Sequence, residues 1–108
     1  MTARATIQAG VCGFRTSVAA VSQDAQYVQL DVQSTCAKIT DVVRDLPLID
    51  AYSEIRDGFD GVLYRRVREV LKGCCAGCVV PPGLFKCMQV AASLALPAKA
   101  GVELSKDE

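Results

Sequence analysis

The chain has 108 residues, with 12 Lys and Arg against 12 Asp and Glu, 51% hydrophobic residues, six Cys and no His. This length supports a single domain, residues 1–108, and is too short for two. The apolar content and the zero formal net charge exclude a disordered chain and a polyanion binder driven by net charge. Because no imidazole is present, Ser-His-Asp catalysis, Cys-His catalysis and His-ligated zinc are excluded as well.

The expected location is cytoplasmic. Met1–Gly10 holds no apolar block of signal-peptide length, and we expect no later stretch to approach the roughly 20 apolar residues of a membrane span. We therefore expect no membrane partner. Cytosolic cysteines rarely form structural disulfides, so metal binding or thiol reactivity is the expected role of the six.

The first third of the chain has the period of β-strands. Thr2–Ala9 alternates small or apolar residues with polar ones, Arg15–Val21 continues after a glycine turn, and Tyr27–Ser34 is the clearest case. The short turns between these segments predict an antiparallel meander with one face in water.

Helical spacing follows. Apolar residues recur at helical intervals from near Cys36, which predicts a helix that ends before Pro47. Leu48–Asp60 is ambiguous, Val62–Lys72 predicts a second helix, and a third begins at Pro81 or Pro82 and ends at Pro97.

Lys99–Leu104 predicts a short final strand. The fold class is therefore α+β: a two-layer sandwich with a three-stranded antiparallel meander, two or three helices on one face and a short C-terminal strand. An exposed sheet edge leaves a homodimer open.

Five of the six cysteines fall in predicted turns or at helix starts, and four of these lie next to exposed backbone N–H groups, which favour a thiolate. Cys87 instead lies among apolar positions of the last helix and is interpreted as a core residue. If the loops converge at one end of the sheet, four thiolates form a site for zinc or an iron–sulfur cluster. The candidate metal ligands are Cys12, Cys36, Cys78 and either Cys74 or Cys75.

Three functional hypotheses stay open. The leading one is a small metal- or iron–sulfur-binding protein that acts as a scaffold, carrier or accessory module with a partner protein in metal or sulfur handling. The second is a metal-free thiol, persulfide or dithiol role, in which Cys78 attacks and Cys75 of the CxxC motif resolves the disulfide. The third is a structural or interaction domain with reduced cysteines. We favour a binding role over an enzymatic one.

Two resemblances rest on these motifs. The segments Gly10–Phe14, Ser34–Ala37 and Cys78–Pro82 carry Cys-Gly-Phe, Ser-x-Cys and Cys-x-Val-Pro patterns. In this the chain is similar over nearly its whole length to a family of small uncharacterised cysteine-rich domains of anaerobic microbes, which implies no function. The order of the parts also resembles IscU/NifU-type iron–sulfur scaffold proteins.

The scaffold resemblance implies that Cys12, Cys36 and Cys78 occupy the positions of the three cluster ligands. Phe14 stands where the scaffolds have Asp, and Gly77 where they have His. Their Leu-Pro-Pro-Val-Lys segment is missing. The resemblance therefore implies a more permanently metallated or persulfide-handling relative instead of a labile assembly scaffold.

The remaining charges predict no further chemistry. The basic residues between Arg56 and Lys72 are interpreted as a solvated helix face, because a nucleic-acid site would need a larger basic field with aromatic residues for stacking. No nucleic-acid partner is expected. The carboxylates between Asp41 and Asp60, Glu54 among them, show no spacing that indicates acid–base catalysis.

Overall fold

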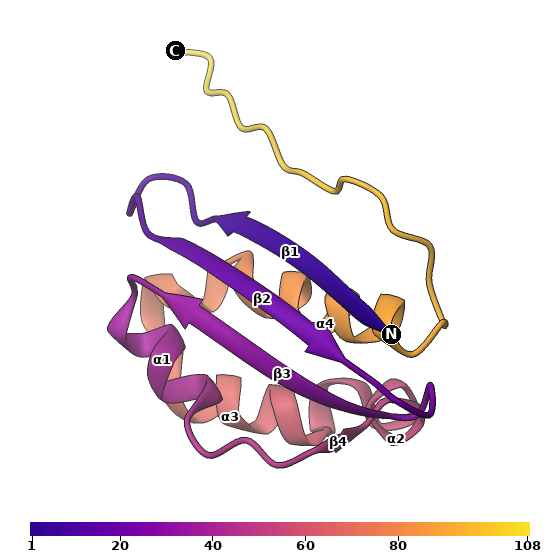
Figure 1. The fold of residues 1–108 in the computed structure, drawn as a ribbon. Coiled ribbons are helices and arrows are strands. Elements are labelled where there is room, and N and C mark those ends of the chain that lie inside the picture. Colours follow the sequence, from indigo (N-terminus) through magenta and orange to yellow (C-terminus); the bar gives the residue numbers. More distant parts are fainter.

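Three strands follow one another at the start of the chain and pair as antiparallel neighbours: β1 (Thr2–Gln8), β2 (Arg15–Val21) and β3 (Tyr27–Ser34). These bounds agree with the predicted meander. The computed structural model describes all 108 residues and arranges them in two layers, with helices covering one face of the sheet (Figure 1). The coarse α+β prediction is confirmed.

Alternation along the strands decides which face is covered. In β2 the residues Thr16, Val18 and Ala20 are buried, while their neighbours point to water or are only partly covered. The same period gives β3 a buried Val28 and Leu30. The opposite face of the sheet carries polar side chains such as Gln29 and has no helix over it.

The helices are shorter than predicted. The structure has α1 (Ala37–Val43), α3 (Val62–Val70) and α4 (Val80–Ala91), with α4 packed on β1 and β2 and α1 packed on β3. Asp45 follows α1 with a φ of 57°, and Ser93 follows α4 with a φ of 60°, so the backbone leaves the helical region well before Pro47 and Pro97.

The ambiguous segment holds three short elements. These are β4 (Ile49–Asp50), α2 (Ala51–Asp57) and the 3-10 turn η1 (Gly58–Asp60). β4 pairs with β3 and makes the sheet four-stranded, in the order β1-β2-β3-β4. Asp50 caps α2 by accepting the backbone N–H groups of Tyr52 and Ser53 at 3.0 and 3.3 Å.

Two expectations need correction. The predicted strand Lys99–Leu104 lies outside the sheet as an extended, exposed segment, so the fourth strand is β4 instead. The 19-residue stretch Gly73–Ala91 also meets the length and composition of a membrane span, contrary to our expectation that none does. In this fold Cys78 and Val79 divide it, and α4 buries Leu84, among others, against the sheet.

Candidate functional site

The sheet topology brings three chain segments to one end of the molecule. In an antiparallel meander the end of β1, the start of β2 and the end of β3 lie at the same edge. The first half of α4 comes to this edge too, because Gly83 packs against Ile7 near the end of β1. The loops that carry the cysteines therefore converge.

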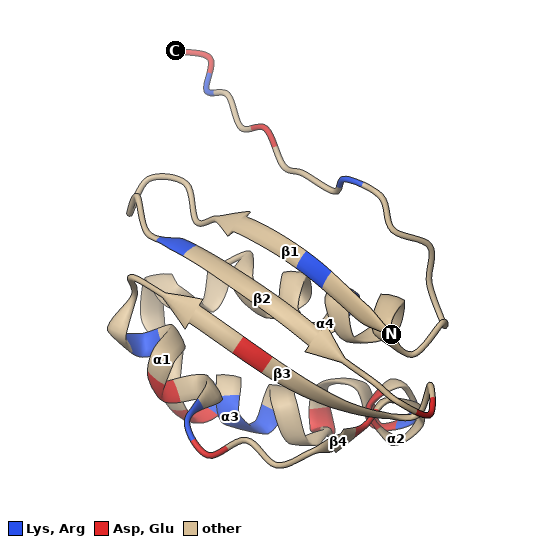
Figure 2. Ribbon diagram, in the orientation of Figure 1, with Lys and Arg blue, Asp and Glu red and all other residues tan.

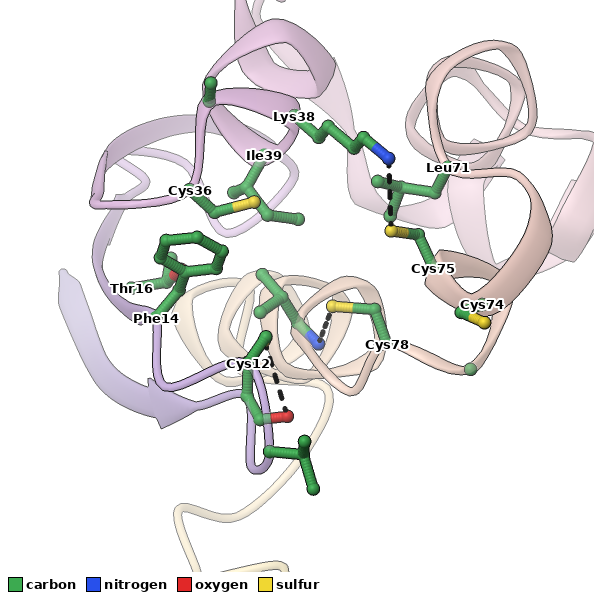
Figure 3. A pocket seen from close by; sticks show the side chains of 15 residues that line it. Cys12, Phe14, Thr16, Cys36, Lys38, Ile39, Leu71, Cys74, Cys75 and Cys78 are labelled. Atoms are coloured by element: carbon green, nitrogen blue, oxygen red, sulfur yellow. Dashed lines mark hydrogen bonds between the residues drawn. The ribbon is translucent and has the colours of Figure 1, made fainter.

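A cavity of about 520 Å³ lies where they meet (Figure 3). Its lining is mainly apolar and includes Phe14, Ile39 and Leu71, together with one cation, Lys38. All five cysteines predicted as ligands line it: Cys12, Cys36, Cys74, Cys75 and Cys78. Their role as ligands stays a prediction.

Cys12 is held by the hairpin between β1 and β2. Gly10 and Gly13 adopt φ values of 87° and 74°, which glycine reaches without strain, and the Gly13 N–H donates to the Gly10 carbonyl at 2.9 Å. This tight turn exposes the Cys12 side chain, whose Sγ lies 4.0 Å from the Ala9 carbonyl oxygen.

Cys36 is placed by the contact between the end of β3 and the start of β2. The hydroxyls of Thr16 and Ser34 hydrogen-bond at 2.8 Å, and Ser34 Oγ also accepts the backbone N–H of Cys36 at 3.1 Å. Cys36 itself occupies the N-cap position of α1 and makes no side-chain cap bond. Its thiol is therefore free of the helix and half-buried at the cavity.

The remaining cysteines lie in a 3-10 turn, η2 (Gly73–Gly77), which leads from α3 to α4. The turn is closed by the Cys78 N–H, which donates to the Cys75 carbonyl at 3.1 Å. Cys75 and Cys78 are half-buried and Cys74 is exposed. Figure 3 shows the sulfurs of Cys75 and Cys78 turned toward the cavity, with Cys74 outside them.

Lys38 gives the adjacent residues Cys74 and Cys75 different surroundings. Its ammonium donates to Cys75 Sγ at 3.5 Å, reaching across the cavity from the first turn of α1 (Figure 3). Sequence analysis missed this residue, because its partner is 37 positions away and no local pattern marks the pair. The contact favours Cys75 over Cys74 as the inward thiol.

The electrostatics of Cys78 differ from the expected effect of a helix start. Burial raises the pKa of the Cys78 thiol, and neighbouring thiolates at Cys12, Cys36 and Cys75 raise it further. The Val80 N–H, 3.5 Å from Sγ, acts in the opposite direction but is outweighed. The backbone N–H at the helix start favours the Cys78 thiolate as predicted, but burial has the larger effect.

The thiols do not form a ready site for a single ion. No three Cys, Asp or Glu side chains stand close enough together to hold a metal. A zinc ion bound by thiolates needs each sulfur at about 2.3 Å from the metal, so the loops would have to close before zinc could bind.

Cys87 lies apart from this site, on the buried face of α4, with 4% of its surface exposed. The prediction that it belongs to the core is confirmed. Burial raises the pKa of its thiol, which keeps it protonated and unreactive at neutral pH.

The sequence matches the model of a family described as a family of unknown function, DUF6951, over residues 3–104. The chain belongs to the DUF6951 family. The match includes every cysteine, and it bears out the predicted resemblance to an uncharacterised domain. No curated protein and no solved structure matches this DUF6951 chain, and the weaker resemblance to IscU/NifU-type scaffolds has no support from these searches.

Proposed function

We propose that the cysteine-lined cavity binds an inorganic centre through thiolates, an iron–sulfur cluster in preference to a single zinc ion. The ligands are Cys12, Cys36, Cys75 and Cys78. The observation that carries this proposal is the approach of thiols from three separate chain segments to one largely apolar cavity.

Repulsion between thiolates supports the binding of a cation in the cavity. Burial raises the pKa of Cys78, and the neighbouring thiolates at Cys12, Cys36 and Cys75 disfavour its ionised form further. A metal centre supplies the positive charge that holds several thiolates ionised together. Among the residues that line the cavity, Lys38 is the one cation that could balance thiolates without such a centre.

The spacing of the thiols favours a cluster. Because no three groups stand at single-ion distances, a zinc site requires the hairpin, α1 and η2 to move together. A cluster spreads its ligand positions over several irons, so the thiols that bind it lie farther apart and less closure is needed. The apolar lining, with Phe14 and Leu71, would shield a cluster from water and oxygen.

The biological role that fits this site is a scaffold, carrier or accessory module in a reducing cytoplasm. Its partner would be a protein that supplies or receives metal or sulfur. All six thiols are free of disulfide bonds, as such a role requires.

Anaerobic reconstitution with ferrous iron and sulfide tests the proposal. We expect iron and acid-labile sulfide to bind in a fixed ratio to the chain, with visible absorbance from thiolate-to-iron charge transfer. Single Ser variants at Cys12, Cys36, Cys75 and Cys78 should lose most of this signal. Cys74→Ser is the matched control, since Cys74 is exposed and Figure 3 shows its sulfur turned away from those of Cys75 and Cys78, and it should bind like the wild type.

Zinc titration of the same proteins distinguishes the metals. If zinc binds tightly and iron with sulfide does not, the cluster is wrong and a single-ion site that closes on binding is right. If neither binds to the fully reduced wild type, the metal proposal fails altogether.

A second candidate rests on the contact between Lys38 and Cys75. In a metal-free dithiol, Cys75 would be the attacking thiol because the Lys38 ammonium lies 3.5 Å from its sulfur, and Cys78, whose pKa burial raises, would resolve the mixed disulfide. This reverses the roles predicted from sequence. Such a protein would exchange disulfides through Cys75 and Cys78 and would tolerate Cys12→Ser and Cys36→Ser, unlike the metal site.

A further inference from the structure

One edge of the sheet has no partner in the folded domain. β1 pairs with β2 on one side only, so the other side of β1 is the open edge of the four-stranded sheet. Met1 and Ser22 exchange two backbone hydrogen bonds, and the Ala9 N–H donates to Phe14. Bonded pairs alternate in an antiparallel ladder, so the N–H groups of Arg4, Thr6 and Gln8 point to the open edge.

The chain's own C-terminal segment has the pattern of a strand. Residues 98–104 alternate without interruption between apolar residues and Lys, Gly or Glu. The segment has seven residues, the same length as β1. Val102 and Leu104 are 69% and 91% exposed where they stand, so pairing with the sheet would remove apolar surface from water.

The chain path brings this segment to the open edge. The hydroxyl of Ser93, just after α4, lies 3.4 Å from the sulfur of Met1, so the segment departs beside the start of β1. Figure 1 shows it running past β1 in the direction of that strand. Pro97, which has no N–H to donate, stands where a strand would begin.

We propose that residues 98–104 bind the open edge of β1 in the same chain as a fifth, parallel strand. The register places Leu104 beside Ile7, so that Val102 and Leu104 lie on the helix side of the sheet. The paired strand shields the edge from other chains, and it ends close to the hairpin that carries Cys12. The family match runs through Leu104 and so includes the whole segment.

Hydrogen exchange of single backbone amides, measured by NMR on the reduced, metal-free protein, tests this without reference to the metal site. In the full chain the amides of Arg4 and Thr6 should be protected, and deletion of residues 97–108 should speed their exchange at least tenfold. The amide of Ala5 is the internal control, because it is bonded to β2 whether or not the segment is docked.

Substitutions in the full chain separate docking from a folding defect. Val102→Asp should speed exchange at Arg4 and Thr6 as the deletion does, while Glu103→Gln, on the polar side of the segment, should not. Equal exchange at Arg4 in the full and shortened chains overturns the proposal. Protection that disappears on dilution of a dimer also overturns it, since the occupant would then be the segment of a second copy.

Discussion

Glu54 offers the sharpest test of how the fold holds α3, the helix that leads into the cysteine-bearing turn η2. Its side chain is 2% exposed, and its two carboxylate oxygens accept the N–H groups of Val62 and Leu63 at 2.8 Å each. These are the first N–H groups of α3, which has no acidic residue in its own first turn and no side-chain cap from Gly61. Glu54 therefore caps α3 from α2, eight positions upstream.

The expected cost of losing this cap follows from the two bonds. Hydrogen bonds to a charged group contribute about 1.5–3 kcal/mol each, and part of this returns as water reaches the freed N–H groups. We therefore expect Glu54→Ala to lower the free energy of unfolding by about 3 kcal/mol, a large share of the total for a domain of this size. Glu54→Gln should cost less, because its amide oxygen still accepts one N–H while its NH2 group faces the other.

Urea denaturation monitored by circular dichroism measures both variants. Glu69→Gln is the control, because its ion pair with Arg66 is exposed and should change the free energy of unfolding by about 0.5 kcal/mol or less. A Glu54→Ala protein within that margin of the wild type would refute the cap and the packing derived from it.

Three further predictions follow from close contacts and pKa shifts. Gly83→Ala should destabilise the fold by about 1 kcal/mol, since the new Cβ would lie 2.5 Å from Cδ1 of Ile7, and a double-mutant cycle with Ile7→Ala should show favourable coupling in urea denaturation. Burial raises the pKa of Cys78 in the folded state. The stability that this contributes is complete below the ordinary thiol pKa and is lost as pH rises through the folded-state pKa. Cys78→Ser should therefore flatten the fall of the melting temperature at alkaline pH. Backbone N–H groups of Tyr27 and Gln26 lower the pKa of Asp24. The stability that this carboxylate contributes is present above the ordinary carboxyl pKa and is lost as pH falls through the lowered value. Asp24→Asn should remove this acid dependence of the melting temperature.

The cysteine-lined cavity and the open edge of β1 meet at the hairpin that carries Cys12. A strand docked along β1 would end beside Ile7, close to where this hairpin loop begins after Gln8. Docking would therefore restrict the hairpin on which one proposed ligand depends. Metal affinity measured with and without residues 97–108 would show whether the two features are coupled.

Local pattern was sufficient for the three long strands and for the burial of Cys87. The three long strands have a strict period of two, and the bounds of β2 and β3 equal the predicted ones. Helix ends were not encoded locally, because α1 and α4 end at Val43 and Ala91, where Asp45 and Ser93 then take positive φ values, before Pro47 and Pro97 are reached. The two-residue β4 had no local signal, since its pairing with β3 alone makes it a strand.

The sequence by itself determined which reactive groups are present and roughly where they lie: thiols without imidazole, in the turns of an α+β chain with short loops. Only the tertiary structure decided how those thiols differ. The contact of Lys38 with Cys75, the burial of Cys78 and the cap from Glu54 all join residues of separate elements. Side-chain distance and desolvation depend on which elements pack together, and no spacing along the chain encodes them.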